Sequence, residues 1–290
     1  MKQAVENYRK SIPALLLAPM VLLLVAFFVA PLLGLLRASF LNGNYLFNGS
    51  GFTLKQYSDF FADPYYVRIL LETFVDGLIV CLLCLLIGFP TGYSLARLPA
   101  RVRRWQTIIV IMPMTLSLVV VVFGWLIVLG RNGFVNSLLV GLGVFSSPER
   151  LLFNRPAVIL VLVQECLPYM ILSIMSVVTQ INPVLEHAAA NLRANRFVTF
   201  QKIIIPLALP GTLVGLNLVF VLSISAFITP RLIGGGRTAM LGGVIYDRIM
   251  TELNWPSGAA MAFVLFLSVI SFTAVMNLLL GSRLLRKVRT

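Results

Sequence analysis

The chain has 290 residues, of which 59% are hydrophobic and only 11% are charged, and its mean hydropathy is +0.96. A soluble domain is about 45–50% apolar and about a quarter charged, so this composition excludes an ordinary soluble fold and indicates that much apolar surface faces lipid. The net charge of +13 is typical of nucleic-acid binders, but the basic residues lie in loops between apolar runs, which membrane topology explains better.

Six apolar runs are long enough to cross a membrane as helices. The first follows a polar segment, residues 1–11, and is too long for a cleavable signal peptide, so we expect it to be retained. The expected spans are 12–40, 69–98, 106–130, 157–181, 207–228 and 257–280, followed by a basic tail, 281–290. Gly88 and Gly92 predict a close helix contact, whereas Pro113 should kink the third span and Pro230 should end the fifth.

The loops on the two sides of the membrane differ in length and charge. On one side they are long: Thr53 followed by Gln56 predicts a capping box for a short helix through Phe61, and Phe134–Leu142 is apolar but too short to cross. On the other side they are shorter and basic. Placing both termini there puts about 14 of the 23 Lys and Arg residues inside, as the positive-inside rule requires, so we expect both termini in the cytoplasm.

The polar segment between the fourth and fifth spans, residues 182–206, has its own helical pattern. Asn182 predicts a helix start, and Glu186 lies in the first turn, where the helix dipole favours an anion. A narrow apolar stripe follows at helical spacing, made of Leu185, Ala188, Ala189 and Leu192. Pro206, Pro210 and Gly211 should then hinge the chain into the fifth span. Such a hairpin of short helices lies on the bilayer or docks into a soluble partner.

This loop resembles the cytoplasmic EAA loop of ABC-importer permeases, whose pattern is E-x-A-A-x-x-x-G followed by an I-x-L-P ending. Glu186, Ala188 and Ala189 match the front, and the run IIIPLALPG matches the end. Arg193 departs from the pattern, because it occupies the place of the glycine that turns the chain between two short helices. Asn195 is an alternative position for a residue in the left-handed conformation.

Three further segments are similar to the spermidine/putrescine-type branch of that family: GFTLKQYSDFFADPYY at 51–66, GFPTGYSLAR at 88–97 and SAFITPRLIGGGRTAMLGGVIYDRI at 225–249. The resemblance implies an all-α integral membrane protein of the bacterial inner membrane. Its fold would be that of a type I importer permease (MetI-like), a single domain over residues 1–290 with six transmembrane helices and a cytoplasmic coupling helix.

The resemblance also implies partners in the lipid bilayer: a second homologous permease, two ATP-binding subunits and a periplasmic solute-binding protein. ATP and magnesium would be bound by the ATPase subunits. For this chain itself we expect no cofactor, metal, catalytic residue or nucleic acid. It has no Gly-Lys dipeptide and hence no Walker A loop.

The coupling role would fall on the helix that follows the fourth span. ATP-driven closure of the ATPase pair would move this helix, tilt spans three to six and open the path outward, and hydrolysis would reverse the motion. The residues assigned to ATPase coupling are Val184, Leu185, Glu186, Ala188, Ala189, Leu192, Arg193 and Arg196. Glu186 is either a first-turn acid stabilised by the dipole or an ion-pair partner of the ATPase. Arg193 and Arg196 are either positive-inside charges or contacts to an acidic edge of the ATPase.

A carboxylate at bilayer depth is costly, so it normally faces a cavity or a partner. The candidate path residues are Glu165, Asp76, Glu72 and Tyr169. Structural alternatives stay open. Glu165 would accept hydrogen bonds from a neighbouring helix, Glu72 would lie among headgroups and Tyr169 would pack as an aromatic.

Carboxylates in the path suit a polycation, and the branch suggests a polyamine. Arg231 and Arg237, near the expected outer mouth, fit instead the opine-like or aminophosphonate solutes of other relatives in this branch. A stand-alone secondary transporter is less favoured, because no convincing repeat relates the two halves. The lone His187 is expected to be solvated, and Cys81 and Cys84 to be buried, inert thiols.

Overall fold

The computed structural model describes residues 19–42, 51–236 and 238–288, and within these ranges every regular element is a helix, apart from an isolated bridge between Leu41 and Phe52. The predicted polar segment 1–11, residues 12–18 of the first span and Arg237 lie outside the described residues. The chain forms two units, one made of residues 1–63 and 245–264 and the other of residues 64–244 and 265–290.

The smaller unit contains the first span and a short helix after it. Residues 19–39 form one helix, which includes a π-turn and then α2 (Ala30–Ser39). The second helix is α3 (Lys55–Ala62). Thr53 Oγ1 accepts a hydrogen bond from the Lys55 N–H at 3.1 Å, but the residue that caps the helix is Leu54, so the predicted capping box of Thr53 and Gln56 is wrong. The unit also holds η4 (Asp247–Thr251) and the first turns of α14 (Trp255–Val288).

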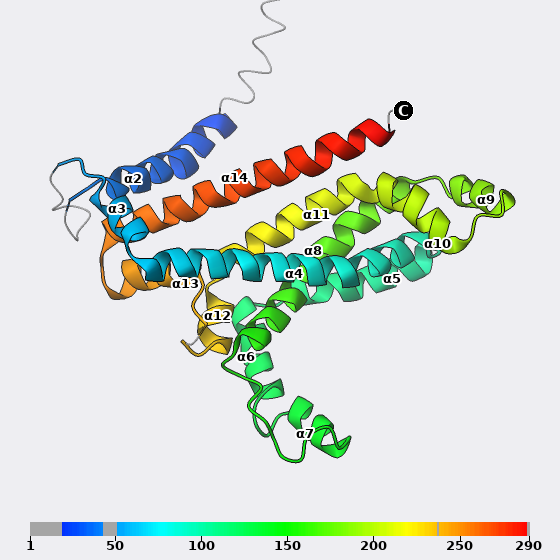
Figure 1. Ribbon diagram of the computed structural model, residues 1–290, viewed down its shortest axis with the longest axis horizontal. Coiled ribbons are helices and arrows are strands. Elements are labelled where there is room, and N and C mark those ends of the chain that lie inside the picture. Colours follow the sequence, from blue (N-terminus) through cyan, green and yellow to red (C-terminus); the bar gives the residue numbers. More distant parts are fainter. Residues whose placement is uncertain (1–18, 43–50, 237, 289–290) are drawn as a thin grey trace, which may run out of the picture. The chain divides into compact units, whose positions relative to one another are not determined.

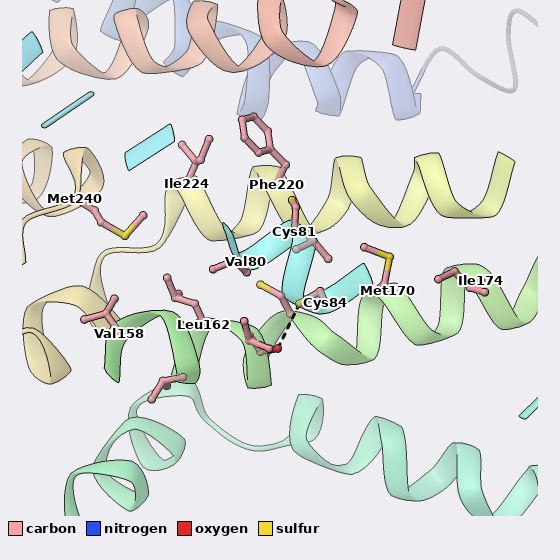
Figure 2. Packing of buried hydrophobic residues seen from close by; sticks show 14 of the residues in the cluster. Val80, Cys81, Cys84, Val158, Leu162, Met170, Ile174, Phe220, Ile224 and Met240 are labelled. Carbon is pink, nitrogen blue, oxygen red and sulfur yellow. Dashed lines mark hydrogen bonds between the residues drawn. The ribbon is translucent and has the colours of Figure 1, made fainter. Parts of the chain in front are cut away.

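Three long helices form the centre of the larger unit: α4 (Pro64–Arg97), α8 (Arg155–Gln180) and α11 (Ile205–Ser225). They pack on one another, with α4 and α8 in the most extensive contact (Figure 1). Figure 2 shows Cys84 of α4 between Leu162 of α8 and Phe220 of α11, and its thiol donates to the Val163 carbonyl at 3.6 Å. The predicted burial of Cys81 and Cys84 as free thiols is confirmed.

Glycines allow α4 and α8 to approach closely, as the pattern at Gly88 and Gly92 predicted. A Cβ atom at Gly92 would lie 2.8 Å from the Ile171 carbonyl oxygen, and one at Gly88 would lie 2.7 Å from Met170 Cγ. Gly211 likewise allows α11 to approach α8 closely, because a Cβ atom there would lie 2.7 Å from the Ser173 carbonyl oxygen of α8. Side chains larger than hydrogen would therefore separate the backbones.

The third span is broken rather than merely kinked. It consists of α5 (Ala100–Ile111) with the 3-10 turn η2 (Met112–Thr115), followed by α6 (Leu118–Val128), and the two parts meet at 94°. Leu116 and Ser117 between them have extended backbones. Pro113 lies at the start of η2, just before this break. Among the described residues, five helices are long and apolar enough to cross a membrane, or six if this bent pair is one span.

The predicted hinge at Pro206, Pro210 and Gly211 is wrong. The helix runs without interruption from Arg196 to Ser225, through α10 (Arg196–Thr199), the π-turn η3 (Phe200–Ile204) and α11. The Ile205 N–H bonds to the Phe200 carbonyl in this turn, and the wider turn accommodates Pro206, which has no N–H, without a break.

The predicted end of the fifth span is also wrong, because α11 ends at Ser225 and Pro230 lies inside the next helix. That helix is α12 (Ile228–Ile233), and the backbone becomes extended at Ala226 before it. The second span begins earlier than predicted, at Pro64, a residue suited to the first helical position. The remaining elements are α7 (Phe134–Gly141), α9 (Val184–Asn191) and α13 (Leu241–Tyr246).

Candidate functional site

The loop after α8 contains the short helix α9 and a tight turn. Asn182 Oδ1 accepts a hydrogen bond from the Val184 N–H at 3.0 Å, which confirms the predicted helix start. At the other end, the Arg193 N–H bonds to the Ala190 carbonyl at 2.9 Å and the Ala194 N–H to the Ala189 carbonyl at 3.0 Å. This pair of bonds is a Schellman motif, which requires a left-handed residue at its turn.

Arg193 is that left-handed residue, with φ of 58°. It therefore adopts the conformation for which the family pattern uses glycine, and the turn is preserved without the glycine. The alternative position, Asn195, is wrong: its φ is −72° and its side chain caps α10 by accepting a hydrogen bond from the Val198 N–H at 2.7 Å.

The apolar stripe predicted for α9 is divided between two sides. Ala189 is buried, with 6% of its surface exposed, and faces its own chain. Leu192, by contrast, is 84% exposed. We call the outward set the outer face of α9, which consists of Val184, Leu185, Ala188 and Leu192. Arg193 and Arg196 are also exposed.

Glu186 points back toward the inner end of α4. Its Oε2 accepts a hydrogen bond from the Tyr93 hydroxyl at 2.8 Å, and its Oε1 lies 2.5 Å from Arg97 Nη2. Both oxygens thus contact residues of the same chain. Sequence reasoning had not assigned Tyr93 or Arg97 to a site. The available signal was their i, i+4 spacing at the end of GFPTGYSLAR, which places both side chains on one face of a helix.

A cavity of about 340 Å³ lies where the broken third span meets α8, α11 and α12. The lining includes Glu165, Tyr169, Gln164, Leu116, Phe227 and Thr229. The Thr229 hydroxyl donates to Glu165 Oε1 at 2.7 Å, and Trp125 Nε1 donates to Gln164 Oε1 at 3.0 Å. Polar groups in this apolar region are therefore oriented by neighbouring helices, and the cavity can hold a small molecule.

The structure does not place Asp76 and Glu72 with Glu165 and Tyr169. Asp76 is only 2% exposed and its Oδ1 lies 2.5 Å from Arg155 Nε. Glu72 pairs with Arg68 one turn earlier on α4, at 2.8 Å. Neither carboxylate is among the residues that line the cavity. The four path candidates thus separate into two cavity residues and two ion-paired residues.

The described residues contain no group of three or more His, Cys, Asp or Glu side chains placed to hold a metal ion. His187 is exposed at the surface of α9, as predicted.

Residues 88–284 match the family model of the binding-protein-dependent transport system inner membrane component. The chain belongs to this family. The matched region begins within α4 and contains both the loop with α9 and the cavity. This permease is therefore a multi-pass inner-membrane subunit of an ABC importer, a transport component rather than an enzyme.

Similar sequences include the spermidine/putrescine transport system permease protein PotB of Escherichia coli K12. This permease is 35% identical to it over 270 residues, which cover 91% of this chain and 95% of that one. The PotB protein of Haemophilus influenzae is 31% identical over 262 residues, covering 89% and 87% of the two chains.

Among solved structures, a chain of a bacterial ABC transporter for the import of the acidic polysaccharide alginate matches with a TM-score of 0.73. The two are 18% identical, and the match covers 97% of this permease and 99% of that chain. This likeness confirms the all-helical importer-permease fold that the sequence predicted.

Proposed function

We propose that this permease is one of two membrane subunits of an ATP-driven importer for polyamines such as spermidine and putrescine, and that the Glu165 cavity lies on the solute path. Two kinds of support meet here: the similarity to polyamine permeases over nine-tenths of the chain and the chemistry of the cavity. The single observation that carries the proposal is the Glu165 carboxylate inside a cavity that also contains aromatic side chains.

The cavity suits an aliphatic polycation. A carboxylate inside a membrane protein attracts a cation, and the rings of Tyr169 and Phe227 offer faces to which ammonium groups bind. Apolar residues such as Leu116 and Leu118 line the rest and suit methylene chains. The volume falls in the usual range of small-molecule sites, about 300–1,000 Å³.

The importer would contain a second permease, two ATP-binding subunits that hold ATP and magnesium, and a periplasmic solute-binding protein. Both termini and the loop with α9 would face the cytoplasm. The outer face of α9 is the proposed ATPase contact, because it presents apolar side chains to solvent at a short, capped helix. Movement of α9 by the ATPase pair would alternate the access of the cavity between the two sides.

An anionic or zwitterionic solute, of the opine-like or aminophosphonate kind, is less well supported. Of the two arginines that would favour it, Arg237 lies outside the described residues, and Arg231 is not among the cavity-lining residues. The cavity instead contains a carboxylate.

The test is Glu165→Gln in the assembled transporter, reconstituted in liposomes with its receptor and ATP. Glutamine still accepts the Thr229 hydrogen bond but carries no charge, so we expect uptake of labelled spermidine to fall about tenfold or more, as for loss of a charge-assisted contact. The matched control is Glu72→Gln, which neutralises a span carboxylate away from the cavity and should leave uptake within about twofold. Wild-type uptake by the Glu165→Gln transporter would remove the cavity from the path.

A further inference from the structure

The inner end of α4 is tied to α9 by three side chains. Tyr93 and Arg97 are four residues apart on α4 and share one face. Glu186, in the first turn of α9, reaches both: Oε2 accepts from the Tyr93 hydroxyl at 2.8 Å and Oε1 lies 2.5 Å from Arg97 Nη2. The Arg97 guanidinium also lies 5.8 Å from the centre of the Tyr93 ring. We call this cluster the α4–α9 tie.

Arg97 joins a third element to the tie. Its Nη1 donates to the carbonyl of Ile181, the residue that follows α8, at 3.0 Å. The side chains of Arg97 and Glu186 are only 19% and 24% exposed, so water screens their attraction less than that of an exposed surface pair. The ends of α4, α8 and α9 therefore meet at one guanidinium.

The covalent chain connects α9 to α8 through residues 181–183 and to α10 through residues 192–195, but neither connection joins α9 to α4. The α4–α9 tie supplies a direct attachment to α4 in the first turn of α9. Because α4 also packs on α8 through Gly88 and Gly92, the three helices form one packed body at this end of the molecule. A packed body transmits a displacement from one helix to the next.

We infer that Tyr93 and Arg97 are positioning residues, which hold α9 through Glu186 so that α4 moves together with α9. This inference rests on the proposed function, in which the ATPase moves α9. It also assigns Glu186 to the inside of the chain, so that the ATPase contact of α9 falls on its apolar outer face.

The test compares four variants of the assembled transporter: Arg97→Gln, Glu186→Gln, the charge exchange Arg97→Glu with Glu186→Arg, and the control Arg104→Gln. Arg104 lies in the same basic segment and is exposed, so the control removes one inner positive charge without touching the tie. Three quantities are measured: the ATPase subunit retained by the tagged permease, labelled spermidine taken up per ATP hydrolysed in liposomes, and the thermal unfolding midpoint of the purified complex.

We expect Arg97→Gln and Glu186→Gln each to retain the ATPase but to lower uptake per ATP at least about fivefold, the lower end of usual coupling between sites. The charge exchange should recover most of the uptake per ATP, because it restores an ion pair between α4 and α9. Arg104→Gln should match the wild type.

Several results would overturn the inference. Wild-type uptake per ATP in Arg97→Gln would do so even if the midpoint fell. So would release of the ATPase by Glu186→Gln but not by Arg97→Gln, which would place the Glu186 partner on the ATPase. If the wild-type transporter took up no spermidine, the polyamine assignment would fail by itself. In that case the charge-exchange variant still tests the tie through its ATP hydrolysis and its unfolding midpoint. Recovery of both would support the tie, and recovery of neither would overturn it.

Discussion

At the scale of single residues, the largest departure from the family pattern is Arg193. A non-glycine residue in the left-handed conformation costs roughly 1–2 kcal/mol, because its Cβ crowds the following carbonyl oxygen. The turn nevertheless keeps both Schellman hydrogen bonds. The contacts on either side, the buried Ala189 and the Asn195 cap of α10, therefore hold Arg193 in a conformation that its own sterics oppose.

Replacing Arg193 by glycine should stabilise the transporter by up to about 1 kcal/mol, because it removes this steric cost. The gain is smaller than the full steric cost, because glycine has more conformational freedom in the unfolded chain. The thermal unfolding midpoint of the purified complex measures the change. Arg193→Val is the comparison: a β-branched residue fits the left-handed region poorly and should lower the midpoint. A lower midpoint for Arg193→Gly would contradict the account.

At the scale of elements, the effect of a proline or glycine on the backbone depends on the helical turns and helices next to it. Pro113 lies in the 3-10 turn before a 94° break, whereas Pro206 lies in a continuous helix because a π-turn precedes it. The break creates a wall of the Glu165 cavity, and the continuous helix joins α10 to α11 without a hinge. Small residues at Gly88 and Gly92 bring α4 against α8, and this contact supports both the core and the tie.

The α4–α8 contact predicts a position-dependent cost of adding one methyl group. Gly92→Ala places a Cβ 2.8 Å from the backbone oxygen of Ile171, which cannot rotate away, so the helices must separate at a cost of about 1–3 kcal/mol. Gly124→Ala in α6 meets no atom within 4 Å and should be neutral or stabilising, since alanine favours helices. Unfolding midpoints of the two variants measure the difference. Equal midpoints would show that the approach of α4 to α8 is looser than described.

At the scale of the whole molecule, the described part of the chain leaves an apolar surface that its own helices do not cover. Its larger unit has a packed core of α4, α8 and α11, yet leaves the apolar outer face of α9 in solvent. An exposed apolar set on a short helix is typical of a binding surface, and this is the role that we propose for it. In the proposed importer, the ATPase covers it.

Placing a charge on that surface should separate the subunits. Leu192→Asp introduces a carboxylate at a residue that is 84% exposed, so the permease should still fold while ATPase retention on the tagged chain falls about tenfold or more. Leu142→Asp is the matched control, because Leu142 is 69% exposed in the loop after α7, far along the chain from α9. Full retention of the ATPase by the Leu192→Asp permease would exclude the outer face as its contact.

The pattern of residues predicted the helical class, the short helix after the fourth span and the close glycine contact. These depend on local properties: the length of an apolar run, the spacing along a helix and the chemistry of a cap. Among the predictions that failed were the hinge at Pro206, the end at Pro230 and the turn at Asn195. In each, the effect of one residue on the backbone depended on what its neighbours in space would accommodate.

The sequence by itself determined that this chain resides in a membrane and belongs with importer permeases, because long apolar runs and the EAA pattern can both be read from consecutive residues. Only the tertiary structure decided which charge serves which purpose. Asp76 pairs with Arg155, Glu186 with Arg97, and Glu165 lines a cavity. The physical reason is that a buried charge is stabilised by a partner from a distant part of the chain, and helix packing alone brings the two together.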